Sequence, residues 1–191
     1  LLRYISVMGT LGHHFKYIVA AFVLTLGQSL PAMAADVDDL MNELSQADPQ
    51  AQARIASQIV AIWENSGSPS MDLLLRRGKD ALDAGDPEAA LDHFSALIDH
   101  APAFSEAYNG RATAYFLLGM TGPALADLRT LLTLEPRHFG AMRGVAVIME
   151  DLDRPAQALD IYRAILQIYP TYDGVVDAVD RLELALEGQA L

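Results

Sequence analysis

Three prolines, Pro102, Pro136 and Pro170, stand 34 residues apart in this 191-residue chain. A fixed interval of roughly 20 to 50 residues is typical of repeat architectures, in which one small supersecondary unit is stacked several times. Because proline cannot continue a helix, each of these residues is expected to follow the end of one. The interval therefore predicts a series of similar helical units, each closed by a proline.

Four other positions of the 34-residue unit keep their character from one unit to the next. When the units are counted from Met71, Ser105 and Phe139, the eighth residue is small and the twentieth is alanine. The twenty-fourth residue is bulky and the twenty-seventh is aliphatic. Small residues let two antiparallel helices approach closely, and a bulky residue fills the space against the neighbouring unit. In order, these positions hold Gly78, Ala112 and Ala146; Ala90, Ala124 and Ala158; Phe94, Leu128 and Tyr162; and Leu97, Leu131 and Ile165.

This pattern resembles the tetratricopeptide repeat (TPR) family, and specifically a short exported bacterial type. The matching residues are Leu74, Gly78, Ala90, Phe94 and Pro102; Tyr108, Tyr115, Ala124, Leu128 and Pro136; and Ala146, Ala158, Tyr162 and Pro170. The resemblance implies an all-α fold, a right-handed α-solenoid of antiparallel helix pairs. The three repeats are then residues 71–104, 105–138 and 139–172.

The segments that flank the repeats also show helical patterns. Residues 35–70 are predicted to form an N-terminal helical hairpin, compatible with a degenerate repeat, with helices over 37–47 and 50–65. Trp63, the only tryptophan, falls in helical spacing with Ile55, Ile59 and Ile62 and is interpreted as a packing residue. Residues 173–191 resemble the extra helix that closes TPR arrays, because a solenoid needs a polar-faced cap.

The first 34 residues have the three-part pattern of a secretory signal peptide. Lys16 precedes an apolar run over 17–26, and Ala32 and Ala34 supply small residues for cleavage after Ala34. An uncleaved inner-membrane anchor is the alternative, although the apolar run is shorter than the roughly 20 residues of a spanning helix. Met8 is a candidate start. We therefore expect an exported, periplasmic protein that contacts the membrane only through this segment before cleavage.

Composition excludes several classes of chemistry. The chain has no cysteine, which removes thiolate metal sites and cysteine nucleophiles, and its net charge of −12 disfavours nucleic-acid binding. His93 and His100 stand seven residues apart, about 10.5 Å along a helix, which is too far for one ordinary metal centre. Neither a glycine-rich phosphate loop nor a nucleophile elbow is present. We expect no catalytic residues, no metal, no cofactor and no enzymatic activity.

The resemblance also places candidate residues in a concave groove lined by the first helix of each repeat. In TPR proteins the second, fifth, ninth, twelfth and thirteenth positions face this groove. A mixture of apolar and hydrogen-bonding side chains there suits an extended peptide or a partner helix. The candidates are Leu75, Lys79, Leu82, Asn109, Thr113, Phe116, Arg143 and Val147, and Glu106 also falls at a groove position.

One TPR subtype is disfavoured. Cochaperone TPRs hold a C-terminal carboxylate with basic and amide residues at five groove positions. This chain has Leu75, Lys79, Gly110, Gly140 and Gly144 there, so a single position retains a suitable side chain.

The sequence thus predicts a non-enzymatic adaptor of a Gram-negative envelope that binds a protein partner in the groove. The alternative is a structural protein that self-associates through the solenoid ends or the convex face.

Overall fold

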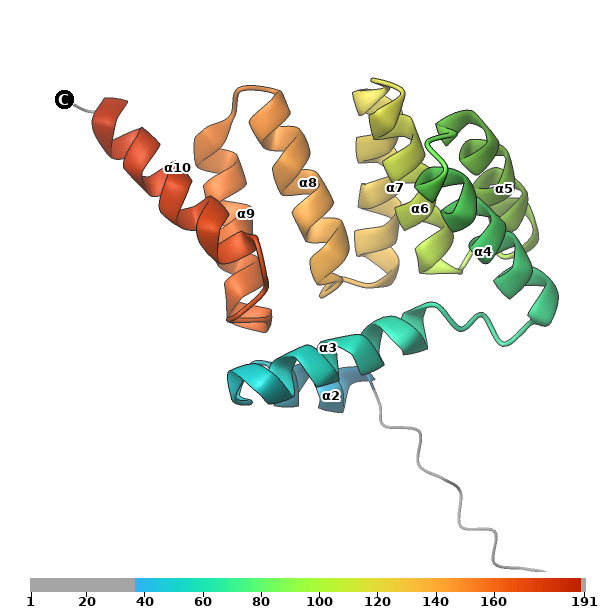
Figure 1. Ribbon diagram of the computed structural model, residues 1–191, viewed down its shortest axis with the longest axis horizontal. Coiled ribbons are helices and arrows are strands. Elements are labelled where there is room, and N and C mark those ends of the chain that lie inside the picture. The colour runs from blue at the N-terminus through green and yellow to red at the C-terminus, as the bar shows by residue number, and fades with distance from the viewer. Residues whose placement is uncertain (1–36, 190–191) are drawn as a thin grey trace, which may run out of the picture. The chain divides into compact units, whose positions relative to one another are not determined.

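The computed structural model describes residues 37–189, and this part of the chain consists of helices joined by short loops, with no strand (Figure 1). The predicted signal peptide lies outside the described residues. Among the residues that are described, no helix is both long and apolar enough to cross a membrane.

Six helices form three consecutive antiparallel pairs. These are α4 (Pro69–Asp83) with α5 (Pro87–His100), α6 (Ser105–Leu117) with α7 (Thr121–Leu134), and α8 (Phe139–Asp151) with α9 (Pro155–Ile168). Each pair also packs against the next, and α10 (Val175–Gln189) packs on α9. Two further helices, α2 (Val37–Leu44) and α3 (Pro49–Trp63), form a hairpin before the first pair. The predicted all-α solenoid of helix pairs is confirmed.

The turn inside each pair repeats with the same 34-residue interval. Gly85 and Gly119 have φ values of 73° and 72°, and the equivalent Asp153 has a φ of 56°. This left-handed conformation is free of steric cost for glycine and is tolerated by aspartate. After the first turn, Asp86 accepts a hydrogen bond from the Ala89 backbone N–H and so caps α5, which begins at Pro87.

The bulky residue at the twenty-fourth position joins neighbouring repeats. Phe94 on α5 is fully buried between two glycines, Gly78 on α4 and Gly110 on α6. A β-carbon at Gly78 would lie 2.5 Å from the Phe94 ring, and one at Gly110 would also overlap it. Leu128 is also buried in the second repeat, where a β-carbon at Gly144 of α8 would lie 3.3 Å from its side chain. The glycines therefore bring consecutive first helices into contact with the second helix between them.

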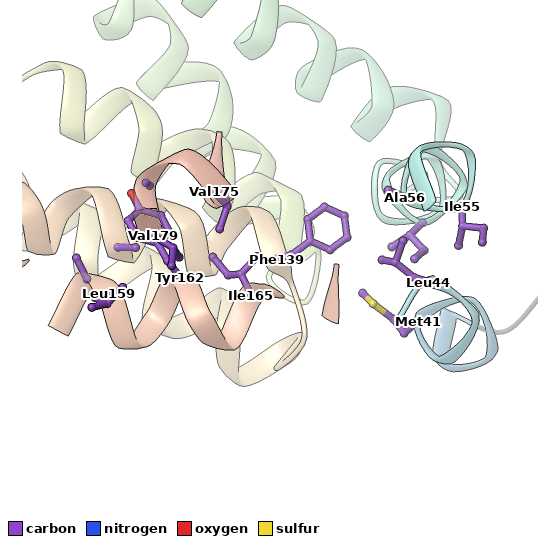
Figure 2. Packing of buried hydrophobic residues seen from close by; sticks show 14 of the residues in the cluster. Met41, Leu44, Ile55, Ala56, Phe139, Leu159, Tyr162, Ile165, Val175 and Val179 are labelled. Atoms are coloured by element: carbon purple, nitrogen blue, oxygen red, sulfur yellow. The ribbon is translucent and has the colours of Figure 1, made fainter. Parts of the chain in front are cut away.

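The apolar interior divides into two clusters. The first contains Phe94, Leu97 and Leu131 and is built from α4 to α7, with Ala141 and Ile148 of α8 added. The second is built from α8, α9 and α10 together with the α2–α3 hairpin (Figure 2). The hairpin thus belongs to the core of the third repeat, although it precedes the first repeat in the sequence.

Polar contacts fix the hairpin to the loops that precede α8 and α10. The backbone N–H and hydroxyl of Thr171 donate to Gln52 Oε1 at 3.1 and 2.6 Å. Arg137 forms an ion pair with Asp38. At the end of α3 the Trp63 ring stacks on His138, with ring centroids 3.9 Å apart. Trp63 is 5% exposed, so it is the packing residue that its helical spacing predicts.

Candidate binding groove

A cavity of about 320 Å³ opens between α6 and α8. Its lining comes from these two first helices, from one residue of α7 behind them and from the loop before α10. The residues are Asn109, Ala112, Thr113, Phe116, Leu128, Gly140, Arg143, Gly144, Val147, Ile148 and Tyr172. The cavity therefore lies on the face that the repeat register assigns to the groove.

The floor of this cavity is apolar and its shape depends on two glycines. Ala112, Leu128 and Ile148 are buried and line it from three different helices. Gly140 and Gly144 are four residues apart and lie on the same face of α8. Because neither has a side chain, the wall formed by α8 is recessed and leaves room for an apolar group of a ligand.

Polar groups stand around this floor. The Thr113 hydroxyl donates to the Asn109 backbone carbonyl at 3.0 Å, and the Asn109 side-chain amide donates to Glu106 at 2.9 Å. Arg143 is exposed. Burial raises the pKa of the Tyr172 hydroxyl, and the positive charge of Arg143 opposes that increase. The cavity thus combines an apolar floor with hydrogen-bonding groups and one cation.

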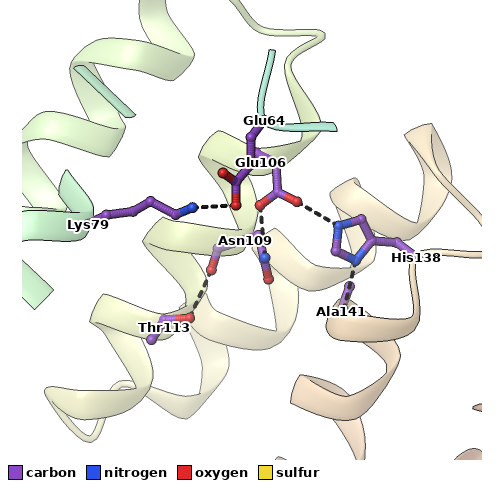
Figure 3. A network of polar contacts seen from close by, with 7 residues as sticks. All are labelled: Glu64, Lys79, Glu106, Asn109, Thr113, His138 and Ala141. Carbon is purple, nitrogen blue, oxygen red and sulfur yellow. Dashed lines mark hydrogen bonds and ion pairs between the residues drawn. The ribbon is translucent and has the colours of Figure 1, made fainter. Parts of the chain in front are cut away.

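A buried polar network lies at one end of the groove (Figure 3). His138 and Glu106 are 2% and 5% exposed, and His138 Nε2 lies 2.9 Å from Glu106 Oε1. The other ring nitrogen, Nδ1, accepts a hydrogen bond from the Ala141 backbone N–H at 2.9 Å and caps α8. Because Nδ1 is an acceptor, the neutral ring carries its proton on Nε2 and donates it to Glu106.

The sequence profile of the tetratricopeptide repeat matches residues 75–120 and 124–173. The chain is also 32% identical, over 153 residues, to a TPR repeat-containing protein of Rhizobium etli, a match that covers 80% of this chain and 75% of that protein. The chain belongs to the tetratricopeptide repeat family.

Two solved structures share the fold of this TPR protein. The first TPR of Spaghetti (RPAP3), bound to the HSP90 peptide SRMEEVD, superposes with a TM-score of 0.58 at 20% identity; the match covers 61% of this chain and 93% of that chain. The MamA protein superposes with a TM-score of 0.55 at 19% identity, covering 83% of both chains. At these identities the likeness concerns the fold.

Five of the eight predicted groove residues of the TPR protein line the cavity. They are Asn109, Thr113, Phe116, Arg143 and Val147. The other three are on α4 and lie outside it. Lys79 forms an ion pair with Glu64, just after α3, and Leu82 is half-buried against the first apolar cluster.

Leu75 does not face the groove as the repeat numbering predicts, because its side chain is 4% exposed and belongs to the first apolar cluster. It precedes Gly78 by three residues, so both share the helix face that packs on the neighbouring helices. Glu106 also occupies the buried network instead of the open groove. The sequence hinted at this network only weakly, because His138 stands where the other two repeats have Phe104 and Tyr172.

The TPR protein is expected to lose stability in acid partly through Glu106. Burial alone would raise the pKa of this carboxyl, but the hydrogen bonds from His138 and Asn109, together with electrostatic attraction to His138 and Lys79, outweigh it, so the pKa lies below its ordinary 4.5. A lowered native pKa adds stability above the unfolded pKa, and this stability is lost as the pH falls through the native pKa.

Urea unfolding of the parent and of Glu106→Gln between pH 6 and 3 measures this effect. The free energy of unfolding of the parent should fall more steeply below about pH 4.5 than that of the variant, because only the parent has this carboxylate to protonate. Equal slopes in the two proteins would contradict the assignment of an ionised Glu106.

Proposed function

We propose that this TPR protein is a non-enzymatic adaptor that binds a peptide or helix of another protein in the groove between α6 and α8. The observation that carries the proposal is the cavity, in which an apolar floor is surrounded by Asn109, Thr113 and Arg143. Ligand sites combine predominantly apolar walls with a few placed polar groups in this way. The peptide held by the first TPR of RPAP3 supports the same use of the fold.

The ligand is proposed to differ from the chaperone tail. Leu75, one of the five positions used by cochaperone TPRs, is buried in the core. Lys79, the single suitable side chain among them, pairs with Glu64. Three glycines fill the remaining positions, and Gly110 lies against the ring of Phe94. These residues leave no cluster of cations for a terminal carboxylate at the usual place.

The setting is proposed to be the bacterial envelope. This proposal is supported by the signal-peptide pattern of residues 1–34. The rest of the chain carries a net negative charge and contains no cysteine. The protein would then hold an envelope protein or complex in its groove after export.

A capture experiment tests the proposal with a pair of matched variants. Thr113 on α6 and Thr130 on α7 are both exposed, and each hydroxyl donates to the carbonyl four residues earlier. Only Thr113 lines the cavity. Tryptophan at position 113 should fill the groove, whereas tryptophan at position 130 changes the surface of a second helix. Circular dichroism must first show equal helix content in both variants.

Each protein is then crosslinked in periplasmic and in cytoplasmic extracts, and captured proteins are identified by mass spectrometry. The proposal expects a periplasmic protein that the parent and Thr130→Trp capture and Thr113→Trp loses by at least about tenfold, because steric exclusion removes the contact surface. Loss with Thr130→Trp alone would instead favour the alternative, in which the convex face makes the contact. A partner found only in the cytoplasmic extract would contradict the envelope role.

A further inference from the structure

Arg143 is the cation that lines the groove cavity. Within residues 37–189 it makes neither an ion pair nor a side-chain hydrogen bond, whereas Lys79, Arg111 and Arg163 of the repeats each pair with a carboxylate. Arg111, on the helix opposite, holds Asp127 through two hydrogen bonds of 2.7 and 2.8 Å. The Arg143 guanidinium therefore keeps its full set of donors for a ligand.

The carboxylates of the two groove helices are committed elsewhere. Glu106 is held by His138 and Asn109. Glu150 is bound by Arg181 at 2.8 Å and by the Tyr162 hydroxyl at 2.9 Å, and the contact with Arg181 lowers its pKa. The remaining acid, Asp151, ends α8 eight residues after Arg143, about 12 Å along the helix axis. Arg143 is thus the local positive charge of this part of the groove, in a chain whose net charge is −12.

The surroundings of Arg143 specify the chemistry of a ligand. Guanidinium is planar and binds a carboxylate through two parallel hydrogen bonds, which fixes its orientation. The apolar floor of Ala112, Leu128 and Ile148 lies in the same cavity of about 320 Å³. A ligand that uses both features carries an anion and a large apolar group next to each other.

We propose that the groove recognises a partner segment in which a large apolar side chain enters the cavity and an adjacent carboxylate pairs with Arg143. This inference rests on the proposed function, because it names the chemistry of the peptide that the groove holds. The carboxylate is that of an aspartate or glutamate side chain, because the positions that hold a terminal carboxylate in cochaperone TPRs carry no cluster of cations here. Arg143 stands at the fifth position of the third repeat. The next position holds Gly144, where cochaperone TPRs have a basic residue.

Peptide selection with the purified chain tests this inference. Two random peptide libraries are used, one displayed with free C-termini and one with the random segment flanked on both sides. Selected peptides are synthesised, and their affinities are measured for the parent, Arg143→Gln and Arg129→Gln. Arg129 is a matched control because it is exposed on α7, outside the groove, and makes no side-chain ion pair or hydrogen bond with any residue from 37 to 189.

The inference expects an aspartate or glutamate beside a large apolar residue in the peptides selected from both libraries. Arg143→Gln should weaken their binding by about 10- to 100-fold, and Arg129→Gln should leave it unchanged. Replacing the peptide carboxylate with an amide should cost the parent the same factor and cost Arg143→Gln nothing further. Enrichment in both libraries is the expected result, whereas enrichment in the first library alone would assign the carboxylate to the chain terminus and contradict the inference.

Two results would overturn the inference in different ways. Peptides that compete for the groove and are lost with Thr113→Trp, yet lack a carboxylate and bind Arg143→Gln normally, refute the role of Arg143 and leave the adaptor function intact. Libraries that give no binder sensitive to Thr113→Trp refute the peptide-binding groove, and the role of Arg143 with it.

Discussion

Replacing Phe94 with alanine is expected to lower the free energy of unfolding by about 3–5 kcal/mol. The ring is fully buried and lies between Gly78 of the first repeat and Gly110 of the second. Because neither glycine has a side chain that can move into the space, the cavity left by the ring stays largely unfilled. The packing between the first two repeats should therefore be weaker in this variant.

Urea unfolding followed by circular dichroism measures this loss. Leu117→Ala is the control, because Leu117 is a large apolar residue of the next helix that is 58% exposed, and it should change the unfolding free energy by less than about 0.5 kcal/mol. Phe94→Leu should recover part of the loss, since a smaller apolar residue still fills some of the volume. A Phe94→Ala protein as stable as Leu117→Ala would contradict the packing described for the junction.

Replacing Trp63 with alanine is expected to destabilise the chain by a similar amount, about 3–5 kcal/mol, and to release the α2–α3 hairpin. Trp63 is 5% exposed and stacks on His138, and its ring centroid lies 5.2 Å from that of Phe139. Without this contact the hairpin loses its largest side chain in the second apolar cluster. Its helices have 8 and 15 residues, and helices of such length are marginal in water without tertiary support.

Amide hydrogen exchange resolves where the stability is lost. In Trp63→Ala, residues 37–63 should exchange faster by more than about tenfold, and the amides of α5 and α6 should change much less because they belong to the other cluster. Ile62→Ala alters the neighbouring residue, which is 39% exposed, and should leave the hairpin protected. Equal exchange of the hairpin in both variants would show that Trp63 does not hold it.

The fold could be predicted in detail because its information is repeated three times along the chain. The twenty-fourth position, which holds Phe94, Leu128 and Tyr162, is buried in every repeat, since the 34-residue spacing returns it to the same environment. The same register places Asn109 and Arg143 in the cavity, because groove positions follow directly from the repeat numbering.

The contacts of the hairpin could not be predicted in this way. Residues 37–63 lack the repeated spacing, so their pattern indicates amphipathic helices without indicating the surface that they cover. Gln52 forms its hydrogen bonds with Thr171, which is 119 residues away in the sequence. Trp63 stacks on His138, and the equivalent position of the other two repeats is not a histidine. Leu75 and Lys79 also make contacts that the repeat numbering does not predict. One faces the core with Gly78, and the other pairs with Glu64 beyond the end of the hairpin.

Site-specific photo-crosslinking in the organism that produces the protein tests whether the groove between α6 and α8 is occupied by a partner. A photoreactive amino acid is placed at Thr113, inside the groove, or at Thr130, on a second helix, in otherwise unchanged full-length protein. We expect one dominant crosslinked partner from position 113 and little or none from position 130. Crosslinks of the same partner from position 130, with position 113 silent, would contradict it.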